Sequence, residues 1–202
     1  MKFLYNNTDI NDMPLNDKQI RPFLIRFLNA ESERPQKIME ELSVCYGDAI
    51  ADVVAADKFL HCYEIKGETD TVQRIQHQGQ FYNKSFMKIT LVTTKNHLEY
   101  AENQAPAYWG ILLASDSDNG TIFEEIRPAE ENPEFSKEEA LHTLWKNELL
   151  DISKENNIPI KEKMSKRAIS QILADNLTNE FIAKSISHII QNRTYNSKSS
   201  YI

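Results

Sequence analysis

Glycine and cysteine are scarce in this sequence, and their scarcity excludes several classes of protein. The 202 residues include five glycines and two cysteines. With so few glycines we find no Gly-rich phosphate-binding loop, and the sequence shows no internal repeat and no zinc-ligand cluster. The motifs of P-loop NTPases, repeat proteins and zinc-finger proteins are therefore absent.

Long apolar runs are absent as well. No stretch approaches the roughly 20 residues of a membrane helix, and residues 1–7 lack the apolar segment of about 7–15 residues found in signal peptides. We therefore expect a cytoplasmic protein without membrane contact. In that compartment Cys45 and Cys62 are expected to be small core residues and not a disulfide.

The charge is negative overall but uneven. The net charge of −7 argues against a protein that coats nucleic acid by bulk electrostatics. Residues 115–160 hold twelve Asp and Glu against four Lys and Arg, whereas residues 161–202 hold seven Lys and Arg against three Asp and Glu. A local cationic groove remains compatible with this distribution.

The pattern of residues 50–66 predicts a β-hairpin that carries charged groups. Two apolar segments, residues 50–56 and 59–65, flank the polar pair Asp57-Lys58. Side chains alternate along a strand, so Glu64 and Lys66 point to one face. Asp52 on the neighbouring strand can join Glu64 to hold a divalent cation, because Mg²⁺ needs only one or two protein carboxylates. A hairpin with one polar face is the simpler alternative.

A helix is predicted directly after this hairpin. Thr69 or Asp70 is a plausible N-cap, and the next polar residues recur at four-residue spacing on one helix face. These residues are Asp70, Arg74, Gln78 and Tyr82. Long polar side chains on that stripe would face the carboxylates and could bind phosphate oxygens.

Taken in this order, Asp52, Glu64-Ile65-Lys66 and the helix segment Gln78 to Tyr82 resemble the PD-(D/E)XK nuclease superfamily. The Q-x-x-x-Y helix motif is similar to that of a bacterial and phage branch, and the resemblance covers roughly residues 17–114. Ala51 stands where the name-giving proline would be. The individual motifs are short, and their ordered combination carries the resemblance.

The resemblance implies a Mg²⁺-dependent deoxyribonuclease in which Mn²⁺ can substitute, with a role in repair, replication or defence. Asp52 and Glu64 are then the metal ligands, with Glu41 either a further ligand or a solvated surface residue. Lys66 would orient the attacking water. Gln78 belongs to the catalytic set, and Arg74 and Tyr82 would bind the DNA backbone. RNA remains open as a substrate.

The remaining patterns predict an α/β fold with a mixed central sheet flanked by helices and a C-terminal helical extension. We expect a nuclease-like α/β domain over residues 1–127, then an acidic linker and a helical subdomain over residues 128–202. The expected helices cover residues 16–29, 95–104, 136–152, 165–176 and 178–193, and further strands cover 35–46, 87–94, 108–114 and 121–127.

Two other classes of function compete with the nuclease. The first is a catalytically inactive module that binds DNA or protein on the same fold, and the second is a helical adaptor or immunity-type protein. The C-terminal helices offer a surface for a homodimer or a protein partner. Their basic residues suggest phosphate contact, although a solvated helix start is the simpler interpretation, and these residues are Lys161, Lys163, Lys166 and Arg167.

Overall fold

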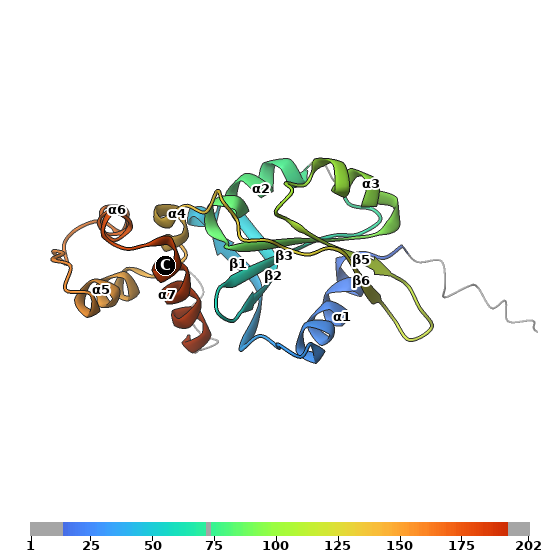
Figure 1. Cartoon of the computed structure of the whole chain (residues 1–202), viewed down its shortest axis with the longest axis horizontal. Coiled ribbons are helices and arrows are strands. Elements are labelled where there is room, and N and C mark those ends of the chain that lie inside the picture. The colour runs from blue at the N-terminus through green and yellow to red at the C-terminus, as the bar shows by residue number, and fades with distance from the viewer. Residues whose placement is uncertain (1–13, 72–73, 194–202) are drawn as a thin grey trace, which may run out of the picture.

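The computed structural model describes residues 14–71 and 74–193, which form one six-stranded sheet with helices around it (Figure 1). The strands follow one another across the sheet in chain order. They are β1 (Lys37–Val44), β2 (Ala49–Ala56), β3 (Leu60–Lys66), β4 (Lys88–Thr93), β5 (Gly110–Ser115) and β6 (Ile122–Arg127). The helices around the sheet are α1 (Asp17–Ala30), α2 (Arg74–Ser85) and α3 (Lys95–Gln104).

Strand directions follow from the lengths of the connections. Strands β1, β2 and β3 are antiparallel neighbours joined by short turns, and the predicted hairpin turns at Asp57-Lys58. Helix α2 carries the chain from β3 to the parallel strand β4, and α3 carries it on to the parallel strand β5. Strand β6 returns antiparallel to β5, so the sheet is mixed, as predicted.

Helices cover the two faces of the sheet unequally. In Figure 1, α2 and α3 lie on one face and α1 lies on the other. The face under α2 and α3 belongs to the larger apolar core, which includes Tyr82, Trp109 and Ile111. The smaller core lies under α1 and includes Leu24, Val53 and Ile65. Trp109 is therefore a core residue.

Helix α1 confirms the predicted amphipathic segment at the start of the described chain. Asn16 caps it, because its Oδ1 accepts from the Lys18 N–H at 2.9 Å and its own N–H donates to the Gln19 side chain at 3.2 Å. Pro22 lies inside the helix beyond the first turn, where it removes one backbone donor. The buried face of Ile20, Leu24 and Leu28 compensates through contact with the sheet.

The C-terminal extension is helical, but it is divided differently from the prediction. The single helix expected from residue 136 is broken into α4 (Lys137–Leu141) and α5 (Lys146–Glu155). Trp145 at the break is 54% exposed and stacks on Arg193, whose guanidinium lies 4.4 Å from the ring centroid. The helical spacing of apolar residues from Leu141 to Ile152 predicts a buried Trp145, and the spacing in the last helix predicts a buried Phe181. Both predictions are wrong, because Phe181 is also exposed, at 39%.

Two further helices, α6 (Lys166–Asn176) and α7 (Asn179–Asn192), complete the extension as predicted. Helix α7 is hydrogen-bonded to the sheet, because Lys37 Nζ of β1 donates to the carbonyls of Ile190 and Arg193 at 3.0 and 2.6 Å. Ser187 Oγ also donates to the Asp57 carbonyl at 2.7 Å. The apolar face of α7 is thus used inside the larger core. A dimer or protein partner on these helices stays a prediction, as does the domain boundary after residue 127.

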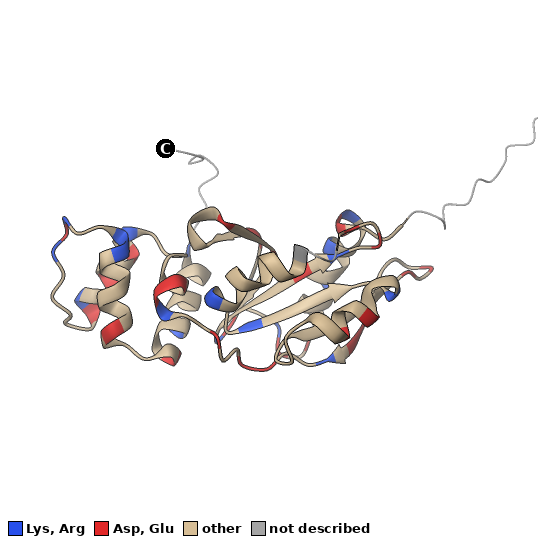
Figure 2. Cartoon of the chain, turned by 90° about the horizontal axis from the view of Figure 1, so that it is seen from above, with Lys and Arg blue, Asp and Glu red and all other residues tan. Residues whose placement is uncertain are grey.

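The fold class is confirmed as α/β with a helical extension. Figure 2 shows Lys and Arg interspersed with Asp and Glu mainly on the helices and loops, while the central strands carry few charged residues. Among the described helices, none combines the length and the apolar character that crossing a bilayer requires.

Gly67, at the end of β3, offers a test of how the chain is packed beside the site. A Cβ there would lie 2.5 Å from the Leu15 carbonyl oxygen and 2.6 Å from the Asn16 Cα, both backbone atoms. We predict that Gly67→Ala lowers the free energy of unfolding by roughly 1–3 kcal/mol, because the backbone must move to make room. Urea unfolding measures the change. The neighbouring exposed Glu68→Ala is the control, and an equal effect in both variants would contradict the packing argument.

Candidate functional site

The centre of the candidate site is a buried carboxylate and ammonium pair on β3. Glu64 is 1% exposed and Lys66 is 8% exposed, and Lys66 Nζ donates to Glu64 Oε1 at 2.5 Å. Ile65 between them belongs to the smaller core on the other face of the sheet. The alternation predicted from the Glu-x-Lys spacing is therefore confirmed.

Helix α2 lies over this pair and contributes two of the predicted residues. Lys66 Nζ also donates to Gln78 Oε1 at 3.2 Å, and Gln78 Nε2 donates to the Tyr82 hydroxyl at 3.4 Å. The Tyr82 hydroxyl lies 2.8 Å from Glu64 Oε2 and 2.7 Å from the Ile50 carbonyl oxygen. We call Glu64, Lys66, Gln78 and Tyr82 the Glu64 network.

Tyr82 has a different position from the one expected of a substrate-binding residue. Its side chain is fully buried, so its ring has no surface for DNA. Its single hydroxyl proton can serve only one acceptor at a time, either Glu64 or the carbonyl of Ile50. We therefore assign Tyr82 to the positioning of Glu64.

Burial controls the protonation of Glu64. Loss of solvent is the largest effect and the nearby negative charge of Asp52 is the next, and together they raise the pKa of Glu64 to about 7. Lys66 and the Tyr82 hydroxyl act in the opposite direction by stabilising the carboxylate. The group therefore exchanges its proton near neutral pH, where a carboxylate at the surface would be ionised.

Asp52 joins the site at an irregularity of the sheet. Ala51 and Val54 belong to the larger core although they are three positions apart, and Val53 belongs to the other core. In a regular strand, residues three positions apart point to opposite faces. The side of β2 that points into the larger core therefore changes at Asp52. The pairing of β2 with β3 ends at Val53 and Tyr63, and the Ile65 N–H donates to Asp52 Oδ2 at 2.8 Å.

Arg21 of α1 is a site residue that the sequence analysis did not identify. Its guanidinium Nη2 lies 3.3 Å from Asp52 Oδ1, and its Nε donates to Asp17 Oδ1 at 2.9 Å. Its Nη1 lies 3.6 Å from Glu40 and 3.7 Å from Glu41. The four-residue spacing of Asp17 and Arg21 was visible as a helix ion pair, but nothing in the sequence placed it beside β2.

Glu41, the additional predicted metal ligand, lies at the edge of the site. Its side chain is 73% exposed, and its carboxylate lies 3.7 Å from the Arg21 guanidinium, farther than the other carboxylates that contact Arg21. Its backbone has a φ of 56°, in the left-handed region. At this residue the side of β1 that points into the larger core changes, as it does in the neighbouring strand β2. A ligand role for Glu41 stays a prediction.

Asp70 and Arg74, the first two residues of the predicted polar stripe, differ in position. Asp70 is outside the helix, because Asp70 Oδ2 accepts from the Gly67 N–H at 2.8 Å in the turn that follows β3. The predicted stripe that began at Asp70 is therefore wrong in its first member. Arg74 begins α2, and its side chain lies outside the described part of the structure.

The carboxylate oxygens of Asp52 and Glu64 are donors that a metal ion could share. Each carboxylate oxygen accepts one hydrogen bond or ion pair, which leaves lone pairs for a cation. Two such hard donors suffice for Mg²⁺, which keeps several waters. Over residues 14–71 and 74–193, however, no group of three or more His, Cys, Asp and Glu is arranged to hold a metal ion.

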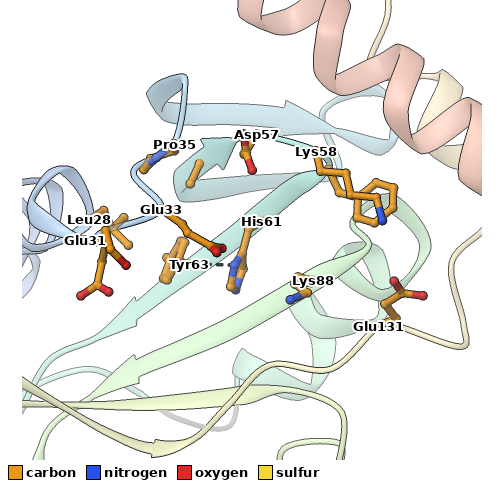
Figure 3. A pocket seen from close by; sticks show the side chains of 13 residues that line it. Leu28, Glu31, Glu33, Pro35, Asp57, Lys58, His61, Tyr63, Lys88 and Glu131 are labelled. Carbon is orange, nitrogen blue, oxygen red and sulfur yellow. Dashed lines mark hydrogen bonds between the residues drawn. The ribbon is translucent and has the colours of Figure 1, made fainter.

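A separate cavity of about 460 Å³ lies on the α1 side of the sheet, away from the Glu64 network. Figure 3 shows Tyr63 directed toward His61, with Lys88 and Glu33 nearby. His61 Nδ1 is 3.2 Å from the Tyr63 hydroxyl and its Nε2 is 2.8 Å from Thr90 Oγ1, so both ring nitrogens have partners. Burial lowers the pKa of His61 to about 3, which keeps it neutral. These contacts hold the sheet together and add nothing to the site.

Comparisons with known proteins give a family. The model of the family described as "Bacteriophage P4 protein cII" matches residues 12–202. A curated relative, "Protein cII" of Enterobacteria phage P4, is 21% identical over 189 residues, which are 93% of this chain and 71% of that protein. A solved structure, the SPO1766 protein of unknown function from Silicibacter pomeroyi, is 21% identical with a TM-score of 0.34, covering 46% of this chain and 60% of that one.

The raised pKa of Glu64 predicts how stability depends on pH when a chelator is present. The folded protein binds this proton more tightly than the unfolded chain, so stability from this group is present below about pH 4.5 and is lost as the pH rises toward 7. Because glutamine does not ionise, Glu64→Gln should reduce the loss of unfolding free energy with rising pH by up to roughly 3 kcal/mol. Urea unfolding at pH 5 and pH 8 measures it. Glu68→Gln is the exposed control, and unchanged pH dependence in Glu64→Gln would reject the assignment.

Proposed function

The chain belongs to the bacteriophage P4 protein cII family, and for this member we propose a metal-dependent nuclease that hydrolyses DNA phosphodiester bonds. The observation that carries the proposal is the Glu64 network together with Asp52. A buried carboxylate with a pKa near neutrality, a buried ammonium and a second carboxylate occupy one place in the fold. Perturbed ionisable groups gathered in this way are typical of active sites.

In this proposal Asp52 and Glu64 hold Mg²⁺, with Mn²⁺ able to substitute. Such an ion supplies Lewis-acid chemistry toward a phosphate oxygen and a nearby water. The two carboxylates come from adjacent strands and are held in place by fixed partners. Asp52 is held by the Ile65 N–H and by Arg21, while Glu64 is held by Lys66 and Tyr82.

Lys66 supplies the fixed positive charge of the proposed mechanism. Its Nζ is shared between Glu64 and Gln78, so it is directed toward the carboxylates without depending on solvent. There it would orient the attacking water and stabilise the negative charge that develops on the phosphate. Gln78 holds the Lys66 ammonium, and Arg74 is proposed to contact the DNA backbone.

One observation favours a second candidate, a module of the same fold that binds DNA or protein without cutting. Arg21 already pairs with Asp52 and Lys66 already pairs with Glu64. Both carboxylates are therefore neutralised by protein cations, and a metal would have to share them. This alternative predicts retention of DNA in the presence of metal without any cleaved product.

Cleavage assays test the nuclease directly. The wild-type protein is expected to cut linear, circular or single-stranded DNA with Mg²⁺ or Mn²⁺ and not with chelator. We predict that Lys66→Ala lowers the cleavage rate by roughly 100-fold while DNA binding persists, because the variant loses transition-state charge stabilisation. Lys58→Ala, at the exposed turn of the same hairpin, is the matched control. Cutting by Lys66→Ala at the wild-type rate would remove Lys66 from the mechanism.

Metal binding should also appear as a change in melting temperature. A cation at about tenfold its dissociation constant stabilises the folded state by roughly 1.4 kcal/mol, or about 3–6 °C for a chain of this size. Asp52→Asn is expected to lose most of that Mn²⁺-induced shift, because it removes one of two ligands.

Asp17→Asn is the control for that measurement, since it removes another carboxylate partner of Arg21 without touching the proposed ligands. A wild-type protein that melts at the same temperature with Mn²⁺ and with chelator would reject the metal site. An intact shift in Asp52→Asn would reject Asp52 as a ligand.

A further inference from the structure

A cavity of about 260 Å³ lies between the α/β part and the helical extension. We call it the Tyr46 pocket, and its principal lining residues are Tyr46, Phe81, Lys84, His142 and Arg167. Tyr46 belongs to the short 3-10 turn η2 (Cys45–Gly47) between β1 and β2, and Phe81 and Lys84 belong to α2. His142 follows α4, and Arg167 lies in the first turn of α6.

Tyr46 exposes an aromatic ring and has a strained backbone conformation. Its φ of 60° is left-handed, as are those of Cys45 at 49° and Gly47 at 98°. This region is unfavourable for residues with a side chain, and especially for bulky ones. Burial does not compensate, because Tyr46 is 60% exposed. The ring lies 4.2 Å from the His142 ring, tilted by 39°, which leaves it available to a second planar group.

His142 supplies an unsatisfied polar atom in the same cavity. Its side chain is 2% exposed, and its Nδ1 lies 3.2 Å from Glu139 Oε2. Its Nε2 is buried and has no hydrogen-bond partner among the residues that the structure describes. Burial lowers the pKa of His142, and in the neutral ring that donates from Nδ1 to the Glu139 carboxylate, Nε2 is an acceptor. A buried acceptor of this kind is satisfied by an N–H or O–H group of a water or a ligand once a small shift of the Tyr46 ring opens it.

The charges around the Tyr46 pocket suit a lone phosphate better than a duplex. Lys166 Nζ lies 5.5 Å from the Tyr46 ring centroid, and Lys84 and Arg167 are exposed. Against these three cations stand Asp48, Glu138 and Glu139, and Arg167 lies 3.7 Å from Glu138. A balanced set of charges cannot neutralise the dense phosphates of double-stranded DNA. It can hold one phosphate beside a stacked base.

Helix α2 connects the Tyr46 pocket to the Glu64 network. Gln78 of the network and Lys84 of the pocket are six residues apart on α2, about 9 Å along its axis. Cys45 beside Tyr46 contacts the same helix, with its Sγ 3.3 Å from Ser85 Oγ. A strand bound at the pocket would therefore lie within two helical turns of Gln78, which contacts Lys66.

We propose that the Tyr46 pocket binds an unpaired base of a single-stranded nucleic acid. The base stacks on Tyr46, the adjoining phosphate contacts Lys84 and Arg167, and a small shift of the Tyr46 ring opens His142 Nε2 to one of the base N–H groups. Stacking on an exposed aromatic side chain requires a base that is not paired in a duplex. The inference rests on the proposed function in one respect, because it takes the bound strand to be the substrate of the nuclease.

Fluorescence anisotropy with a labelled single-stranded oligonucleotide in chelator tests the binding, with the duplex of the same sequence as comparison. The wild-type protein should prefer the single strand. Tyr46→Gly removes the ring at a position where glycine favours the left-handed backbone, and it should weaken single-strand binding by roughly tenfold. Tyr46→Phe keeps the ring and should bind as the wild type does.

Salt dependence gives a second measurement that uses an exposed side chain and so does not depend on how Tyr46→Gly folds. Arg167→Ala should lower the slope of log affinity against log salt by about 0.7 for the lost phosphate contact. Lys163→Ala removes an exposed charge outside the lining of the Tyr46 pocket and should leave the slope unchanged.

The outcomes separate this inference from the proposed function. Wild-type affinity in a folded Tyr46→Gly variant, an unchanged slope in Arg167→Ala, or preference of the wild type for duplex would overturn the inference even if the protein cuts DNA. Single-strand binding that depends on Tyr46, without cleavage in Mg²⁺ or Mn²⁺, would support the Tyr46 pocket and reject the nuclease.

Discussion

The burial of the Glu64 carboxylate is the constraint on which the arrangement of the site depends. An ionised carboxylate taken out of water is strongly destabilising unless charged and hydrogen-bonding partners surround it. Lys66 on the same strand and Tyr82 on α2 meet that requirement. Because Tyr82 also contacts the Ile50 carbonyl, one buried group fixes the position of α2 over both β2 and β3.

The site also requires the irregularity in β1 and β2, where the buried side of each strand changes. Glu41 adopts a left-handed φ opposite Asp52, and both strands exchange their buried faces there. The Asp52 carboxylate can then bond the backbone of β3 while Arg21 approaches it from α1. The site is thus assembled from both sides of the sheet, with the Glu64 network under α2 and Arg21 contributed by α1.

Local patterns predicted much of this arrangement from the sequence. The hairpin, the shared face of Glu64 and Lys66, and the position of Gln78 facing the carboxylate strand depend on strand and helix periodicity, which short segments reveal. Arg21 could not be found, because its contact with Asp52 joins residues that are 31 positions apart. The break at Trp145 was missed because the apolar spacing continues through it, although Trp145 is capped as a new helix start by Glu148.

The attachment of α7 to β1 and to the β2–β3 turn has a consequence for the motions of the chain. Lys37 holds the carbonyl end of α7, and the apolar face of α7 shares the larger core with β2 and β3. Local opening of α7 would have to break these contacts together with those of the sheet. Amide protons of α7 should therefore exchange with solvent in the same cooperative unit as those of β2 and β3, and the helical extension would not fray from the sheet by itself.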